Sequence, residues 1–267
     1  MLQFYGIIAL VNYECSYMQI LIGCAKIMTG NIPRNIPFVT EPVFQKLADE
    51  NALQLLQYSV EELQEMMRVN RDIAVENWKR FQAFYARETR IPAVFSYDGM
   101  VYQRLAPETM TDDELQYANE HLLISSFLYG LLRPLDLVNK YRLEGDVMLP
   151  NHDGKSMFDF WKPILTDWFI RKIKADDGIL VNLASGEMRN LFDWKRVKKE
   201  VNIITPEFKV EKDGRAKTIV IYTKMCRGAM TRYILQNRMP NTELLKTFEY
   251  EGFRLDEAAG DWTFVLR

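Results

Sequence analysis

Two short runs of strand-forming residues, separated by long helical patterns, constrain the fold of this chain most. Residues 19–23 read Gln-Ile-Leu-Ile-Gly, and Gly178–Asn182 is a second run of this kind. Short apolar runs bounded by turn residues are typical of buried strands in a sheet that helices cover. The chain is therefore predicted to have a mixed α/β fold that opens on a buried strand.

Capping signals predict where helices lie between these runs. Ser59–Glu62 has capping-box spacing, and apolar residues then recur every three or four positions to Phe81, which predicts one amphipathic helix. Thr111–Glu114 is a second capping box and predicts a helix through about Phe127. A third helix is expected over about Gly228–Asn237.

Glycine-containing turn pairs indicate hairpins. Asp98-Gly99 and Asp213-Gly214 suit tight turns because glycine accepts positive φ angles, and strand-like runs at 252–256 and 262–266 close the chain. No repeat or flexible linker divides the sequence. We therefore expect one compact body over residues 18–267, with a mixed sheet, hairpins and flanking helices.

Residues 1–17 differ in character from the rest of the chain. They are apolar but too short to span a membrane, and Met18 stands directly before the first strand. We interpret them as an extension or as a start-site artefact, and we expect no membrane association.

Cysteine and histidine usage bears on compartment and metal binding. The three cysteines and two histidines lie far apart, without the paired spacing of a zinc site. An odd number of cysteines suits a reducing cytosol, so a cytoplasmic protein is expected. No metal site and no cofactor can be identified. The cysteines are Cys15, Cys24 and Cys226, and the histidines are His121 and His152.

Charge excludes some classes of function. With 48% hydrophobic and 26% charged residues the chain is not a disordered scaffold, and a net charge of -2 excludes a histone-like protein. Residues 41–120 hold 15 acidic and 8 basic side chains, whereas residues 181–240 hold 13 basic and 6 acidic. Two interpretations stay open: one basic face suited to phosphate, or two solvated faces of opposite charge.

The segment Phe127–Glu144 combines a glycine, an Arg-Pro step and further basic residues. It predicts a helix, a turn at Gly130 and a second helix, an arrangement that offers backbone N–H groups to a phosphate while Arg133 or Lys140 supplies charge. The alternative is an ordinary helix connection with buried leucines.

Polar side chains follow three predicted strand ends, and parallel strands bring their carboxyl ends together at one edge of a sheet. Such groups suit an oxyanion or a phosphate, and Glu187 suits a base. The alternative is an ion-pair cluster that holds the strand ends together. The candidates for this pocket are Lys26, Asn182, Ser185, Glu187, Lys224 and Arg227, the last two flanking a predicted strand-to-helix turn, with Arg232 in the predicted helix that follows.

Catalytic assignments within this set are limited to Lys26, Ser185 and Glu187. Ser185 equally suits an N-cap, and its surroundings lack the Gly-x-Ser-x-Gly nucleophile elbow, which disfavours a Ser-His-Asp hydrolase. Neither a Walker loop nor a Gly-x-Gly-x-x-Gly fingerprint is present, so ATP and dinucleotides have no specific support.

Taken together, several motifs resemble those of the YaaA family of bacterial peroxide-stress proteins. They are Ala25-Lys26, "DGMVYQRL", "LYGLLRPLDL", "YRLE", "NLAS" with Glu187, and "KMCRGAMTR", and they extend from Met18 to the carboxyl terminus. Where the family usually has Ser-Pro-Ala-Lys, this chain has Gly23-Cys24-Ala25-Lys26.

The resemblance implies a single mixed α/β fold with a positively charged cleft and a helix-hairpin-helix-like element. It also implies DNA binding and protection from hydrogen peroxide by limiting unincorporated intracellular iron. We therefore expect a stress protein that binds DNA without sequence preference. The alternatives are an enzyme acting on a phosphorylated or nucleotide-like small molecule, and a non-catalytic iron-handling or partner-binding protein.

Overall fold

A computed structural model describes residues 17–267, apart from 31, 33, 37, 87–88 and 213. Its centre is a five-stranded sheet in the order β6-β5-β1-β8-β9, in which β1 lies between two parallel neighbours. Leu21 of β1 is level with Leu123 of β5 on one side and with Asn182 of β8 on the other. The strands are β1 (Gln19–Gly23), β5 (Leu122–Ser126), β6 (Gly130–Leu132), β8 (Ile179–Asn182) and β9 (Asn202–Ile204).

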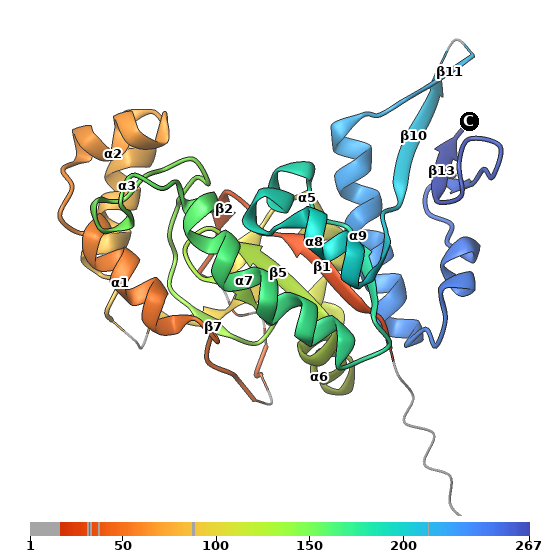
Figure 1. Ribbon diagram of the computed structural model, residues 1–267, viewed down its shortest axis with the longest axis horizontal. Coiled ribbons are helices and arrows are strands. Elements are labelled where there is room, and N and C mark those ends of the chain that lie inside the picture. The colour runs from red at the N-terminus through yellow and green to blue at the C-terminus, as the bar shows by residue number, and fades with distance from the viewer. Residues whose placement is uncertain (1–16, 31, 33, 37, 87–88, 213) are drawn as a thin grey trace, which may run out of the picture.

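The predicted opening strand and the predicted strand at Gly178–Asn182 are confirmed as β1 and β8. Both are buried because helices cover the sheet, among them α6 (Asp112–His121) and α7 (Met157–Lys174) (Figure 1). Trp161 of α7 is fully buried, and its indole N–H donates to the carbonyl of Phe127 at 2.7 Å. The mixed α/β fold and the single compact body are confirmed.

Three helices form a lobe at one end of the molecule (Figure 1). The prediction of one helix from Ser59 to Phe81 is wrong, because Arg68 takes a left-handed φ of 52° and Asn70 caps a new helix by accepting from the backbone N–H of Ile73. The capping box at Ser59 is confirmed. The helices of this lobe are α1 (Gln45–Leu55), α2 (Val60–Met67) and α3 (Arg71–Gln82).

Two predictions around the sheet are corrected. The capping box at Thr111 is confirmed, but its helix ends at His121, because the next five residues pair with β1 as the buried strand β5. The predicted helix, glycine turn and helix over Phe127–Glu144 are also wrong. Gly130, with a φ of 73°, instead begins β6, which returns antiparallel to β5, and the chain then continues through β7 (Leu137–Val138).

The Asp98-Gly99 hairpin is wrong as well. Tyr97–Asp98 forms strand β4, which pairs with the distant β2 (Ile27–Met28), and Gly99 has an extended φ of 164° before α5 (Met100–Leu105). Nearby, β3 (Ile91–Pro92) pairs with β7, and α4 is Ala93–Ser96.

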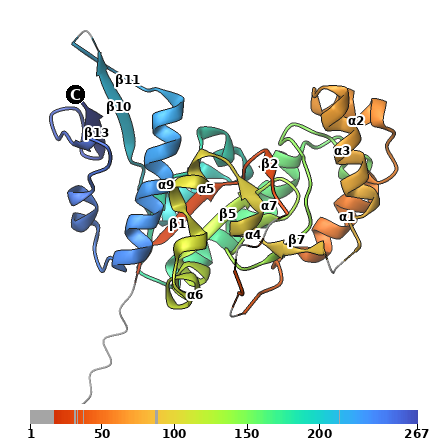
Figure 2. The same ribbon diagram turned by 180° about the vertical axis from the view of Figure 1, so that it is seen from behind.

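A second sheet, in the order β11-β10-β13-β12, lies at the end opposite the helical lobe (Figure 2). The predicted hairpin is confirmed as β10 (Glu207–Lys212) and β11 (Arg215–Lys217), although Asp213 at its turn lies outside the described residues. The closing strand-like runs are confirmed as β12 (Arg254–Leu255) and β13 (Thr263–Leu266).

The predicted helix over Gly228–Asn237 begins eight residues earlier, as α9 (Val220–Asn237). The run Thr218–Tyr222 is rich in β-branched residues and favours a strand on propensity. Val220–Tyr222 instead forms the exposed first turn of α9, whose later residues pack against α5. The structure also contains α8 (Trp194–Glu200) and 3₁₀ helices at Pro107–Thr109, Pro150–His152, Gly186–Leu191 and Thr242–Thr247. Among the described residues no helix has both the length and the apolar character needed to cross a bilayer.

Candidate functional site

A pocket of about 420 Å³ opens at the carboxyl ends of β1, β5 and β8. The chain after β1 leads towards β5 on one side of it, whereas the chain after β8 leads to β9 on the other side. Ligands of open α/β sheets bind at such a reversal, outside the ends of parallel strands. The apolar part of the lining comes from residues including Ile27, Met100, Val101, Tyr102, Phe127, Tyr141, Leu143, Leu183 and Met188.

The structure brings most of the predicted pocket residues together. Asn182 is the exception: it is 1% exposed, and its side-chain oxygen accepts from the backbone N–H of Ala184 at 3.3 Å, so it holds the turn after β8. Ser185 precedes the 3₁₀ helix, but its hydroxyl makes no capping hydrogen bond there. The residues that do line the pocket are Lys26, Ser185, Glu187, Lys224 and Arg227.

Lys224 and Arg227 enter the pocket from the first half of α9. The prediction that they flank a strand-to-helix turn is wrong, because the helix already contains them. Their separation of three residues places both on one face of the helix, and that face borders the pocket. The polar groups therefore converge from two strand ends and one helix.

Glu144 is a pocket-side residue that the sequence reasoning missed. Its carboxylate accepts from the Lys26 ammonium at 2.9 and 3.1 Å and from the Arg142 guanidinium at 3.1 Å. Glu144 is 14% exposed, so the carboxylate fixes the position of both cations at the pocket wall. Lys26 is therefore paired with Glu144 and not with Glu187.

Two cations at the pocket lack a counter-charge. In the described part of the chain, neither Lys224 nor Arg227 forms an ion pair, and the half-buried Arg227 has a buried Nε without a hydrogen-bond partner. Desolvation lowers the pKa of Arg227, and the nearby charge of Arg189 lowers it further. The Arg227 guanidinium therefore does not neutralise a carboxylate among the described residues, and it suits an anion that binds from outside.

Cys24 stands where the family pattern has proline, one position before Ala25-Lys26. Burial raises the pKa of its thiol to about 12, and the carboxylates of Glu144 and Glu187 contribute to the rise. The thiol is therefore protonated at neutral pH, when it is a weak nucleophile.

Aromatic hydroxyl groups fix the floor of the pocket. The hydroxyl of Tyr141 is 2.9 Å from that of Tyr97 and 2.6 Å from that of Ser126, and Tyr102 donates to the carbonyl of Gly23 at 3.0 Å. Desolvation raises the pKa of Tyr141 well above its ordinary value, so this network stays neutral. It orients the rings without adding charge.

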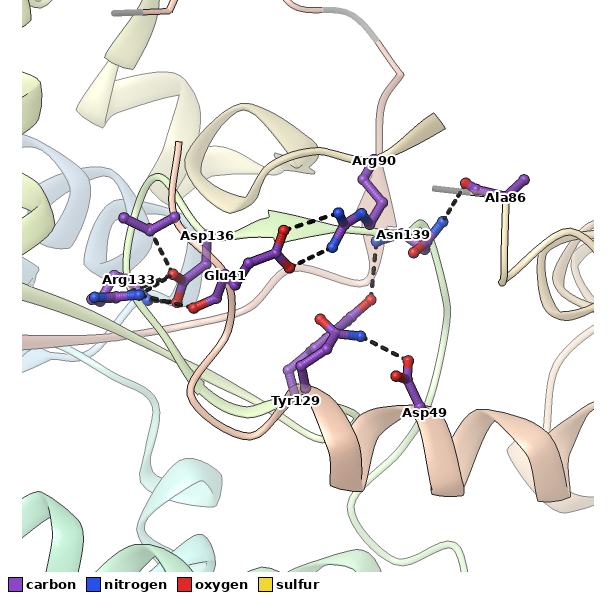
Figure 3. A network of polar contacts seen from close by, with 10 residues as sticks. Glu41, Asp49, Ala86, Arg90, Tyr129, Arg133, Asp136 and Asn139 are labelled. Carbon is purple, nitrogen blue, oxygen red and sulfur yellow. Dashed lines mark hydrogen bonds and ion pairs between the residues drawn. The ribbon is translucent and has the colours of Figure 1, made fainter. Parts of the chain in front are cut away.

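Arg133 lies outside the pocket and contacts the protein itself (Figure 3). Its guanidinium donates to the carboxylate of Asp136 at 2.8 and 3.1 Å and to the carbonyl of Glu41 at 2.8 Å. Asp136 is fully buried and also accepts from the Thr40 hydroxyl at 2.7 Å. These contacts occupy Arg133, which the sequence had suggested as a phosphate ligand.

Lys140 and Arg232 are also absent from the pocket lining. Arg232 donates to the carbonyls of Leu105 and Ala106 at 2.9 and 3.0 Å and so satisfies the carboxyl end of α5. Lys140 lies beside Gly30, where an added Cβ would be 3.2 Å from its Nζ. The pocket thus brings together three of the predicted phosphate ligands, Lys26, Lys224 and Arg227. The other four, Arg133, Lys140, Asn182 and Arg232, are absent from its lining. No group of three or more His, Cys, Asp or Glu able to hold a metal occurs among the described residues.

Comparison with known proteins places the chain in a family. Residues 18–259 match the family model described as peroxide stress protein YaaA. The chain belongs to the YaaA family. A UPF0246 protein of Bacteroides fragilis is 54% identical over 247 residues, which cover 92% of this chain and 96% of the relative. A UPF0246 protein of Porphyromonas gingivalis is 45% identical over 241 residues, covering 88% and 93%.

YaaA membership confirms the resemblance seen in the motifs and supports a role in peroxide stress. A UPF0246 protein of Phocaeicola vulgatus is 54% identical over 250 residues. These residues cover 93% of this chain and 98% of the relative. The matched length extends over the pocket-lining segments, from Lys26 to Arg227.

Proposed function

We propose that this YaaA family member acts in peroxide stress by binding DNA, with phosphates held by the free cations at the pocket. The observation that carries the proposal is the pair Lys224 and Arg227, which have no counter-charge among the described residues. Arg227 is half-buried beside a second arginine, an arrangement that costs free energy until an anion arrives. A phosphate supplies that anion and accepts the guanidinium hydrogen bonds.

Binding of this kind is electrostatic and indifferent to base sequence, because phosphates carry no sequence information. Protection from unincorporated iron belongs to the same proposal. Ferrous iron and peroxide generate hydroxyl radicals, and a protein bound along DNA stands where these radicals do their damage.

The first prediction concerns the variant Lys224→Met with Arg227→Met. Methionine keeps the aliphatic volume and removes the charge, so we expect at least a tenfold loss of duplex affinity at low salt. The slope of log affinity against log salt should fall by roughly 0.9 for each lost phosphate contact. The melting temperature should be unchanged or slightly higher, because the repulsion between Arg227 and Arg189 is gone. Fluorescence anisotropy measures the DNA affinity and its salt slope, and thermal unfolding measures the melting temperature.

The matched control is Lys46→Met with Lys79→Met, two exposed lysines of the helical lobe at the other end of the molecule. It has the same net charge as the test variant and should bind DNA as the wild type does. Equal affinity of the two double variants would overturn the assignment of phosphates to the pocket.

The pocket volume favours a second candidate, a nucleotide-like small molecule. About 420 Å³ falls within the range of small-ligand sites, and the lining combines apolar and aromatic residues with few polar groups. Calorimetry with inorganic phosphate and with a nucleoside monophosphate tests it. Binding of the nucleotide that Arg227→Met abolishes, without any DNA binding by the wild type, would favour the small-molecule function.

A further inference from the structure

The β10–β11 hairpin stands away from the body of the molecule and leads directly into α9 (Figures 1 and 2). Every residue from 214 to 222 is exposed, and β11 is an edge strand that pairs, among the described residues, with β10 alone. We call Lys212 together with residues 214–224 the basic arm.

The register of the hairpin gathers positive charge on one face of the basic arm. Lys212 lies directly opposite Arg215, and Lys217 is two residues further along β11, so all three side chains project from the same face. Like charges directly opposite each other destabilise a hairpin. No counter-charge relieves them within the described residues.

The acidic side chains on β10 do not neutralise this face. Glu207 pairs with Lys209 at 2.6 Å and Glu211 with Arg267 at 2.9 Å. The charges left free on the described part of the hairpin are therefore positive, and they complement a row of phosphates.

Apolar side chains follow this charge in the sequence. Ile219, Val220, Ile221 and Tyr222 are 38, 66, 52 and 36% exposed, at the point where the hairpin meets α9. Single exposed apolar residues are ordinary, but four in succession beside free cations form a patch suited to a ligand with both apolar faces and negative charge. An unpaired nucleic-acid strand has both, because its exposed bases pack against apolar or aromatic side chains while its backbone follows the cations.

The basic arm is continuous with the pocket. Val220, Lys224 and Arg227 are spaced i, i+4 and i+7 on α9 and share one face of the helix. That face extends roughly 10 Å, at 1.5 Å for each residue, from the arm to the pocket wall. A strand lying on the arm is thereby led to the two free cations of the pocket.

We infer that the basic arm binds a single-stranded segment of DNA, with phosphates on Lys212, Arg215 and Lys217 and bases against Val220 and Ile221. A duplex is a poorer ligand for the arm because its base faces are covered by stacking. This inference rests on the DNA binding proposed above and adds the surface and the form of DNA that it recognises.

The test compares binding of a labelled oligothymidylate and a duplex to three variants. The charge variant K212A/R215A/K217A should lose at least tenfold in affinity for the single strand, with the salt slope lowered by roughly 0.7 for each lost contact. The apolar variant V220S/I221S should lose severalfold for the single strand, with an unchanged salt slope and little change on the duplex. The control K46A/R71A/K79A changes the same residue types on the helical lobe and should bind as the wild type does.

The outcomes separate the two proposals. If the wild type binds neither form of DNA, the proposed function fails. If it binds and K224M/R227M loses affinity while both arm variants bind normally, the function stands and the arm inference is overturned. Normal DNA binding with loss of peroxide protection in arm variants would also overturn it, because the arm would then serve a protein partner.

Discussion

Replacing Gly228 by alanine should unfold this protein at a markedly lower temperature. Gly228 lies where α9 crosses α5, and a Cβ there would be 2.1 Å from the carbonyl oxygen of Val101 and 2.9 Å from Cβ of Arg104. The obstacle is backbone, so a rotamer change cannot relieve it and the helices must separate. Overpacking costs 1–3 kcal/mol in general, and we expect about 3 kcal/mol or more here.

In a chain of this size, each kcal/mol corresponds to about 2–4 °C in melting temperature. Calorimetry should therefore show a drop of roughly 6 °C or more for Gly228→Ala. The matched control is Gly186→Ala, because an added Cβ at Gly186 meets nothing within 4 Å. DNA affinity should fall together with stability, since α5 supplies Val101 to the pocket wall and α9 supplies Arg227. A melting temperature for Gly228→Ala equal to that of the control would contradict the close α5–α9 packing.

Arg133→Ala should also destabilise the protein strongly, without the direct effect on DNA that its sequence context suggests. Its guanidinium neutralises the negative charge of Asp136, whose side chain has no exposed surface. Removing one partner of a buried pair costs 3–5 kcal/mol, and because the Arg133 side chain is 31% exposed we expect about 2–3 kcal/mol. Urea unfolding measures this loss, and DNA affinity of the folded variant should equal that of the wild type.

The same variant carries a pH signature. Desolvation raises the pKa of Asp136 above its usual 3.8 even with Arg133 present. A raised carboxyl pKa in the folded state means that stability falls as pH rises above 3.8 and through the folded pKa. Without Arg133 the pKa rises further, so the penalty of Arg133→Ala should be largest at neutral pH and should shrink as pH falls into that window.

Adding Asp136→Asn to Arg133→Ala removes the uncompensated charge and should recover part of the lost stability at neutral pH. An equal penalty for Arg133→Ala at neutral and acidic pH would show that the lost packing of Arg133, and not the charge of Asp136, accounts for the effect.

Local signals in the sequence were sufficient for several structural elements that are decided by their own residues. The bounds of β1, the strand β8 and the capping boxes at Ser59 and Thr111 follow from apolar runs and hydroxyl-to-backbone geometry. One failure is local, because Asn70 caps α3 inside the predicted Ser59–Phe81 helix. The other failures discussed here occur where a distant segment decides. Thr218–Tyr222 is strand-like alone and becomes connector and helix because it leads into α9, whose later residues pack on α5. Leu122–Ser126 continues a helical pattern and becomes a strand because β1 offers a hydrogen-bonding edge.

The candidate site was partly predictable for a topological reason. Parallel strands end at one edge, so Lys26 and Ser185 line the same pocket although they are 159 positions apart in the sequence. Glu144 was missed because it lies in an extended segment without periodicity, and its "YRLE" motif does not indicate that its carboxylate faces Lys26. Arg133 was misassigned because an Arg-Pro step does not reveal a buried aspartate three residues later.

The order of the central sheet has a consequence for synthesis on the ribosome. The strand at its centre, β1, is made first, but its two partners appear only with residues 122–126 and 179–182. Both of its hydrogen-bonding edges are therefore open in the nascent chain while residues 24–121 are made. Such edges invite pairing with other chains. The growing polypeptide is thus most exposed to aggregation before β5 has emerged from the exit tunnel, and chaperone demand should peak there.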